Sequence, residues 1–66
     1  MSNNHPNHIL LFNMSSQQWN CFHRLHGVPL IAEDYGRPIS VGYTIDECVD
    51  EALGKGVKRW DIEVIE

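Results

Sequence analysis

The sequence has few cysteines, no long apolar run and few basic residues, and each scarcity excludes a class of protein. Cys21 and Cys48 are too few for the disulfide framework of a small secreted domain. No apolar stretch approaches the ~20 residues that span a bilayer. Residues 1–8 lack the basic start and the apolar core of a signal peptide. We therefore predict a cytoplasmic protein with reduced thiols and no membrane partner.

Charge is unevenly distributed along the chain. The formal net charge is −4, and all nine acidic residues lie in residues 33–66. Residues 1–32 contain four histidines and a single base, Arg24. A nucleic-acid-binding domain normally shows a concentrated basic patch, whereas the other four bases here are interleaved with acids. We expect no nucleic-acid partner, and the acidic half favours association with a basic partner.

The 66 residues are enough for one small domain. A chain of this length buries only about 60% of its unfolded surface, so its stability is marginal. Residues 1–7 are polar, contain a proline and show no periodicity. We predict a mobile N-terminal tail over 1–7 and a single α+β domain over 8–66.

Most of the chain shows recognisable periodicity. The apolar run within residues 8–13 predicts a strand buried on both faces. Residues 28–34 predict an edge strand because proline stands near the start, and residues 39–43 and 57–66 alternate as strands. The capping box formed by Thr44 and Glu47 precedes an apolar stripe, which predicts a helix that ends at Gly54 or Gly56.

Residues 16–26 are compatible with two structures. Ser15 and Gln18 fit a capping box, and Gly27 stands where a helix would end, so a helix is favoured. The alternation of Trp19 and Cys21 with polar neighbours leaves a strand as the alternative. The helical reading gives the order β-α-β-β-α-β.

That order predicts a ferredoxin-like fold, with a four-stranded antiparallel sheet and two helices on one face. If residues 16–26 form a strand, the alternative is a strand-rich sheet with one C-terminal helix. In the ferredoxin-like fold the first strand is central and one of its faces is open. Leu10 and Phe12 point to one side and their apolar neighbours to the other, so apolar side chains lie on the open face.

Exposed apolar surface of this kind marks an interaction site. We therefore expect the open face, with Leu10 or Phe12, to be covered by another protein or by a second copy in a homodimer. The alternative is that the N-terminal tail or the strand twist covers it. Tyr35, in a predicted hairpin loop, is a candidate interface anchor because tyrosine is enriched at binding hot spots.

The predicted C-terminal helix presents an acidic face. It is either a solvated surface or a patch that meets a basic site on a larger complex, and it comprises Asp46, Glu47, Asp50 and Glu51. Small phage and mobile-element inhibitors act in the second way, an analogy of size and charge only. Residues 43–53 (YTIDECVDEAL) resemble the strand-to-helix step of HicB-type antitoxins, a resemblance that covers eleven residues and carries no site residues.

Metal binding and catalysis have weaker support in the sequence. Cys21, His23 and His26 include good zinc ligands, but their spacing is not a familiar zinc motif. Cys21 with a neighbouring histidine is the one candidate nucleophile–base pair. We therefore predict a protein-interaction module, such as an inhibitor or modulator, without cofactor or enzymatic activity. The alternative is a regulatory domain that binds a small ligand or a metal.

Overall fold

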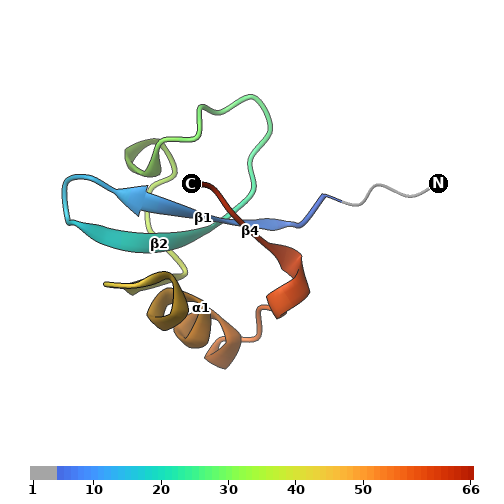
Figure 1. Ribbon diagram of the computed structural model, residues 1–66. Coiled ribbons are helices and arrows are strands. Elements are labelled where there is room, and N and C mark those ends of the chain that lie inside the picture. Colours follow the sequence, from blue (N-terminus) through green and yellow to red (C-terminus); the bar gives the residue numbers. More distant parts are fainter. Residues whose placement is uncertain (1–4) are drawn as a thin grey trace.

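The computed structural model describes residues 5–66, and it folds these residues into one mixed sheet with one helix (Figure 1). Two short 3-10 turns lie in the connecting segments: η1 between β2 and β3, and η2 between α1 and β4. The elements in chain order are β1 (His8–Asn13), β2 (Gln18–His23), η1 (Ala32–Asp34), β3 (Ser40–Gly42), α1 (Ile45–Gly54), η2 (Arg59–Asp61) and β4 (Ile62–Val64). Within residues 5–66, no helix is both long enough and apolar enough to cross a bilayer.

The predicted ferredoxin-like fold is wrong. The strand order is β3-β2-β1-β4, with β1 antiparallel to β2, β2 antiparallel to β3, and β4 parallel to β1. A ferredoxin-like sheet is antiparallel and carries two helices, whereas the described chain has one parallel strand pair and one helix. The alternative with a single helix has the right number of helices.

The expected helix over residues 16–26 is replaced by a tight turn and strand β2. The side-chain Oδ1 of Asn13 accepts hydrogen bonds from the backbone N–H groups of Ser15 and Ser16. Gln17 adopts a φ of 60°, and its N–H donates to the carbonyl of Asn13. Such a side-chain turn reverses the chain at once. The polar residues that resemble a helix cap therefore belong to a β-hairpin.

Residues 28–34 do not form the predicted edge strand. They follow an irregular path that includes η1, and the N–H of Ile31 donates to the carbonyl of Pro29 in a tight turn. Figure 1 shows this green segment on the side of the sheet opposite α1. It buries Ala32 against Ile9, Leu11 and Phe22. The face that we expected to be open is therefore covered by the chain's own connection between β2 and β3.

The last strand is shorter than predicted because η2 interrupts the alternation of residues 57–66. Ile62 is buried and Val64 is half-buried, as their alternation requires. Trp60 lies within η2, where its side chain is 78% exposed instead of joining the core. The chain thus displays a large aromatic side chain close to the start of β4.

Strand β1 lies between two apolar layers. Leu10 and Cys21 face α1, where they pack with Cys48 and Ala52. Ile9 and Leu11 face the opposite layer. The prediction that β1 is buried on both faces is confirmed. The apolar core of this short chain therefore consists of two layers, one on each side of the sheet.

Part of the predicted tail is held against the domain. Residues 1–4 lie outside the described residues. The N–H of Asn7 donates to Asp61 Oδ1 at 2.8 Å, and the carbonyl of Pro6 accepts from Arg24 Nε at 2.7 Å. Contacts with the rest of the domain therefore begin before β1.

Helix α1 is capped as predicted and packs unusually close to β3. Thr44 Oγ1 accepts a hydrogen bond from the N–H of Glu47 at 3.1 Å. A Cβ atom placed on Gly42 would lie 2.5 Å from the Cys48 nitrogen and 2.8 Å from the Glu47 Cβ. Only glycine therefore fits at this crossing of helix and strand.

We expect Gly42→Ala to lower the free energy of unfolding by about 1–3 kcal/mol, because the added methyl group must push α1 away from β3. Gly54→Ala is the matched control, since a Cβ there meets no atom within 4 Å and alanine gains up to about 1 kcal/mol in helix propensity. Denaturant titration of both variants checks this. Equal stability of the two would contradict the close approach.

Candidate functional site

The structure separates the two apolar residues predicted at an interface. Leu10 is fully buried beneath α1 and is not available to a partner in this fold. Phe12 is 36% exposed, and its ring meets that of Trp19 edge-on with centroids 5.4 Å apart. The two rings sit at the hairpin end of the sheet, on the same face as Leu10.

Tyr35 is not an exposed loop anchor. It follows η1, is half-buried, and its ring lies 5.1 Å from that of Phe22. Its hydroxyl oxygen is buried and has no hydrogen-bond partner among residues 5–66. Tyr35 therefore helps to close the second apolar layer, and its hydroxyl is a cost to stability.

Tyr35→Phe should leave the fold intact and raise the free energy of unfolding by up to about 1 kcal/mol, because it removes a buried hydroxyl that makes no hydrogen bond. Tyr43→Phe serves as the control, since Tyr43 is mostly exposed. Thermal unfolding of the two variants measures the difference. A lower melting temperature for Tyr35→Phe alone would show that the hydroxyl has a stabilising partner.

The four acidic residues of α1 fall into two pairs with different roles. Glu47 Oε1 accepts a hydrogen bond from the N–H of Tyr43 at 2.9 Å. Glu51 Oε1 accepts one from the N–H of Val41 at 3.1 Å, and its other oxygen pairs with Lys55 at 3.5 Å. These carboxylates satisfy backbone groups along the outer edge of β3, so they are part of the fold.

Asp46 and Asp50 form the second pair. Among residues 5–66, neither side chain has a hydrogen bond or an ion pair that holds it. Both line a hollow of about 430 Å³ between α1 and η2, which we call the α1–η2 groove. Its lining residues are Asp46, Glu47, Val49, Asp50, Leu53 and Arg59.

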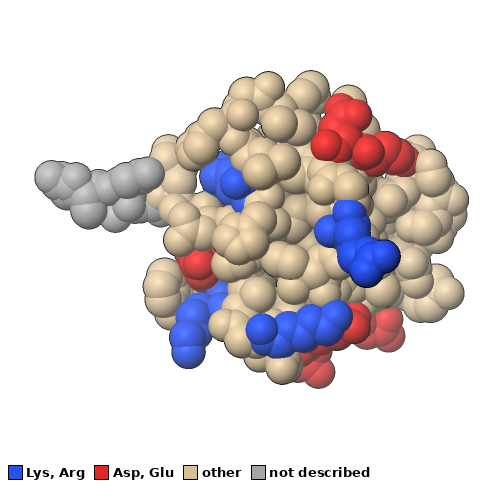
Figure 2. Space-filling view, turned by 180° about the vertical axis from the view of Figure 1, so that it is seen from behind, with Lys and Arg blue, Asp and Glu red and all other residues tan. Residues whose placement is uncertain are grey.

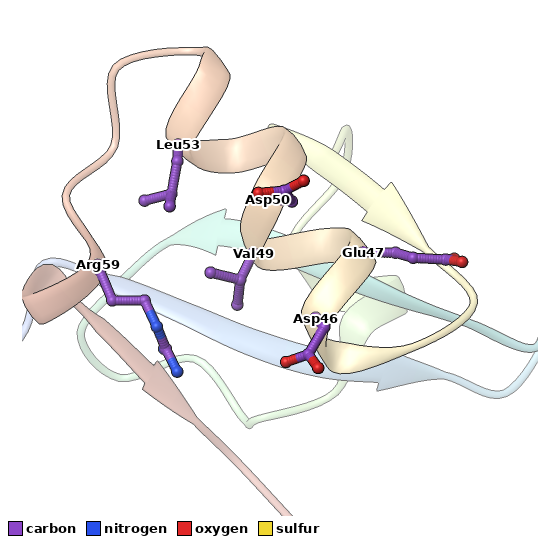
Figure 3. Close-up of a pocket in the computed structure, with 6 residues that line it drawn as sticks. All are labelled: Asp46, Glu47, Val49, Asp50, Leu53 and Arg59. Carbon is purple, nitrogen blue, oxygen red and sulfur yellow. The ribbon is translucent and has the colours of Figure 1, made fainter.

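The α1–η2 groove combines apolar walls with an excess of negative charge. Figure 3 shows Val49 and Leu53 pointing from α1 into the gap above β4, with Asp46 across from Arg59. Leu53 is 39% exposed. The lining holds three acids and one base. A ligand for this groove therefore needs both an apolar portion and positive charge.

Three of the acids predicted at an interface, Asp46, Glu47 and Asp50, line this groove, whereas the sequence does not indicate its other lining residues. Leu53 lies on the apolar stripe of α1, near the C-terminal end of the helix, and remains partly exposed. Arg59 faces α1 only because η2 turns the chain. The neighbouring Trp60 is exposed, and no periodic pattern in residues 57–66 reveals the turn at η2.

The weak metal candidates do not converge. Cys21 is buried under α1, the ring of His23 lies 4.5 Å from that of His8, and His26 lines a separate hollow. Among residues 5–66, no group of three or more His, Cys, Asp or Glu side chains could hold a metal ion.

Burial makes both thiols poor nucleophiles. Desolvation, with the adjacent Cys48 thiol, raises the pKa of Cys21 to about 11. Desolvation likewise raises the pKa of Cys48, although Ser40 Oγ lies within 3.5 Å of its sulfur. Since the thiolate is the reactive form, neither group is activated in the folded protein.

We expect both cysteines to resist a disulfide reagent such as Ellman's reagent in native buffer at pH 8, and to react fully in concentrated guanidinium chloride. The release of thionitrobenzoate, followed at its absorbance maximum, measures this. Rapid labelling of one thiol in the native protein would show that the core opens there, or that the thiol is activated.

A second hollow, of about 310 Å³, lies under residues 24–30 and is lined in part by His5, Arg24 and His26. Its main charge is already engaged, because Arg24 forms an ion pair with Glu63 and donates to the Pro6 carbonyl. Nearby, hydrogen bonds from Asn7 and His8 lower the pKa of the Asp61 carboxyl. These contacts join residues 6–8 to Arg24 and to Asp61 in η2, so the charges of Arg24 and Asp61 are already engaged.

Surface charge is scattered elsewhere on the molecule. Figure 2, the view from behind, shows basic side chains in separate places with acidic ones between them. Positive charge therefore does not gather on this face, and the α1–η2 groove remains the best candidate site. Comparisons with family models, with curated proteins and with solved structures found no match to this chain.

Proposed function

We propose that this protein is a protein-interaction module that binds a basic segment of its partner in the α1–η2 groove. One observation supports this most directly. Glu47 and Glu51 accept hydrogen bonds from the backbone along β3. Asp46 and Asp50 instead line the groove beside its apolar residues and make no hydrogen bond or ion pair among residues 5–66. Unpaired carboxylates beside an apolar surface suit lysine or arginine, whose apolar stems pack while the charged heads form ion pairs.

A different protein fits the groove better than a second copy of this chain does. The net charge is −4, so two copies repel each other at long range. The exposed Trp60, next to Arg59 in η2, offers the kind of aromatic anchor that concentrates binding energy. The proposed role as an inhibitor or modulator of a larger complex depends on the analogy of size and charge. The two unoxidised thiols suit a reducing compartment, so we propose a cytoplasmic location.

Asp50→Arg tests this proposal without weakening the helix. Arginine has a higher helix propensity than aspartate, and at position 50 it would lie four residues after Asp46, where the two side chains can pair. We expect immobilised wild-type protein to retain a partner from a lysate of its own source cells, and Asp50→Arg to lose it. Quantitative mass spectrometry of the retained proteins measures this.

Asp34→Arg is the matched control. Asp34 is an exposed acid in η1, on the opposite side of the sheet, and the substitution makes the same change in net charge. A partner retained by wild type and Asp34→Arg but not by Asp50→Arg supports the groove. Equal losses in the two variants would mean that only net charge matters, and equal retention would mean that the groove is not used.

A further inference from the structure

The two outer edges of the sheet are not equivalent. An edge strand presents unpaired N–H and C=O groups that can bind another chain. At one edge, the outward N–H group of Val41 in β3 donates to Glu51, and the N–H of Tyr43, directly after β3, donates to Glu47. The side chains of α1 therefore close this edge to a partner.

The edge formed by β4 is open. The N–H of Ile65 points inward and donates to the carbonyl of Leu10 at 3.0 Å, so the N–H of the preceding Val64 points outward. Among residues 5–66 it has no hydrogen-bond partner. The N–H of Ile62 is engaged with Arg59 in η2. Val64 thus carries the free donor of this edge.

The open edge and the α1–η2 groove lie on the same side of the molecule. Helix α1 packs over β3 and β2, which leaves the β1–β4 half of that sheet face less covered. Figure 3 shows β4 passing below the groove, with Arg59 in the turn η2 that precedes the strand. Val64 faces the same side as Leu10, toward α1.

A strand added beside β4 would send alternate side chains to this face. A long basic side chain at such a position can pack its methylene stem on the apolar lining of this face and bring its charge to Asp46 or Asp50. A short apolar side chain would not reach the carboxylates. The occupant that satisfies both features is an extended segment with Lys or Arg at alternate positions.

We propose that an extended, basic segment of the partner adds to the sheet as a fifth strand along β4, with its Lys or Arg side chains in the α1–η2 groove. This inference rests on the proposed function and specifies its binding mode: main-chain hydrogen bonds to Val64 supply affinity, and the groove supplies specificity.

Val64→Pro is the decisive variant. Proline removes the outward N–H and blocks strand addition, yet it is tolerated where the N–H of an edge strand faces solvent. The preceding residue, Glu63, already has the extended backbone that proline requires. Val64→Ala is the control, because it loses the same side-chain packing but keeps the N–H. Melting temperatures of both variants confirm that each is folded.

The probe is a phage-displayed library of random linear peptides, selected on wild-type protein. We expect the selected peptides to carry Lys or Arg at alternate positions. Synthetic versions should bind Val64→Pro at least about tenfold more weakly than wild type, and Val64→Ala less than about threefold more weakly. Asp50→Arg should lose binding as well, whereas Asp34→Arg should keep it. Fluorescence anisotropy gives the dissociation constants.

Each other outcome separates this inference from the proposed function. If Asp50→Arg loses binding but Val64→Pro retains it, the partner uses the groove without adding a strand, and the inference is overturned alone. If both variants bind like wild type, the selected peptides use another surface and both ideas fail. A selection that yields no binder also overturns strand addition, because a linear peptide should suffice for it.

Discussion

The close approach of α1 to β3 at Gly42 is the constraint on which the arrangement of the surface depends. With no side chain at this position, the helix backbone comes near enough for the carboxylates of Glu47 and Glu51 to reach the outer N–H groups of β3. The same placement leaves Asp46 and Asp50 in the lining of the α1–η2 groove, with Asp46 across from Arg59 (Figure 3). This close approach at Gly42 thus lets Glu47 and Glu51 bond the backbone, while Asp46 and Asp50 make no such bond within the described part of the chain.

The second constraint is the small size of the chain. A domain of this length has little apolar surface to bury and cannot leave one face of its sheet bare. The structure solves this with an irregular connection instead of a second helix, since Ala32 and Tyr35 cover Ile9 and Phe22. The buried and unsatisfied hydroxyl of Tyr35 is a consequence of closing a sheet face with a loop.

The sequence predicts the elements that depend on local chemistry. The apolar run of β1 and the Thr44 cap of α1 are both confirmed. Prediction from the sequence fails where a distant contact or a single side chain determines the path of the backbone. Asn13 stabilises a hairpin turn that imitates a helix start, and η2 displaces Trp60 from an otherwise regular alternation. Of the candidate site, the sequence identifies the acids but not the groove, because Arg59 lies opposite α1 only in the folded chain.

The two edges of the sheet differ in whether their backbone N–H groups are free, and this difference bears on binding. A small protein with two open edges would pair with copies of itself, and closure of the β3 edge by carboxylates removes one of them. Strand β4 at the other edge is short, and the α1–η2 groove on the same side of the sheet carries the negative charge of Asp46 and Asp50. That charge repels a second copy of this acidic chain but attracts a basic strand. The same acidic residues can therefore limit self-association and select the partner.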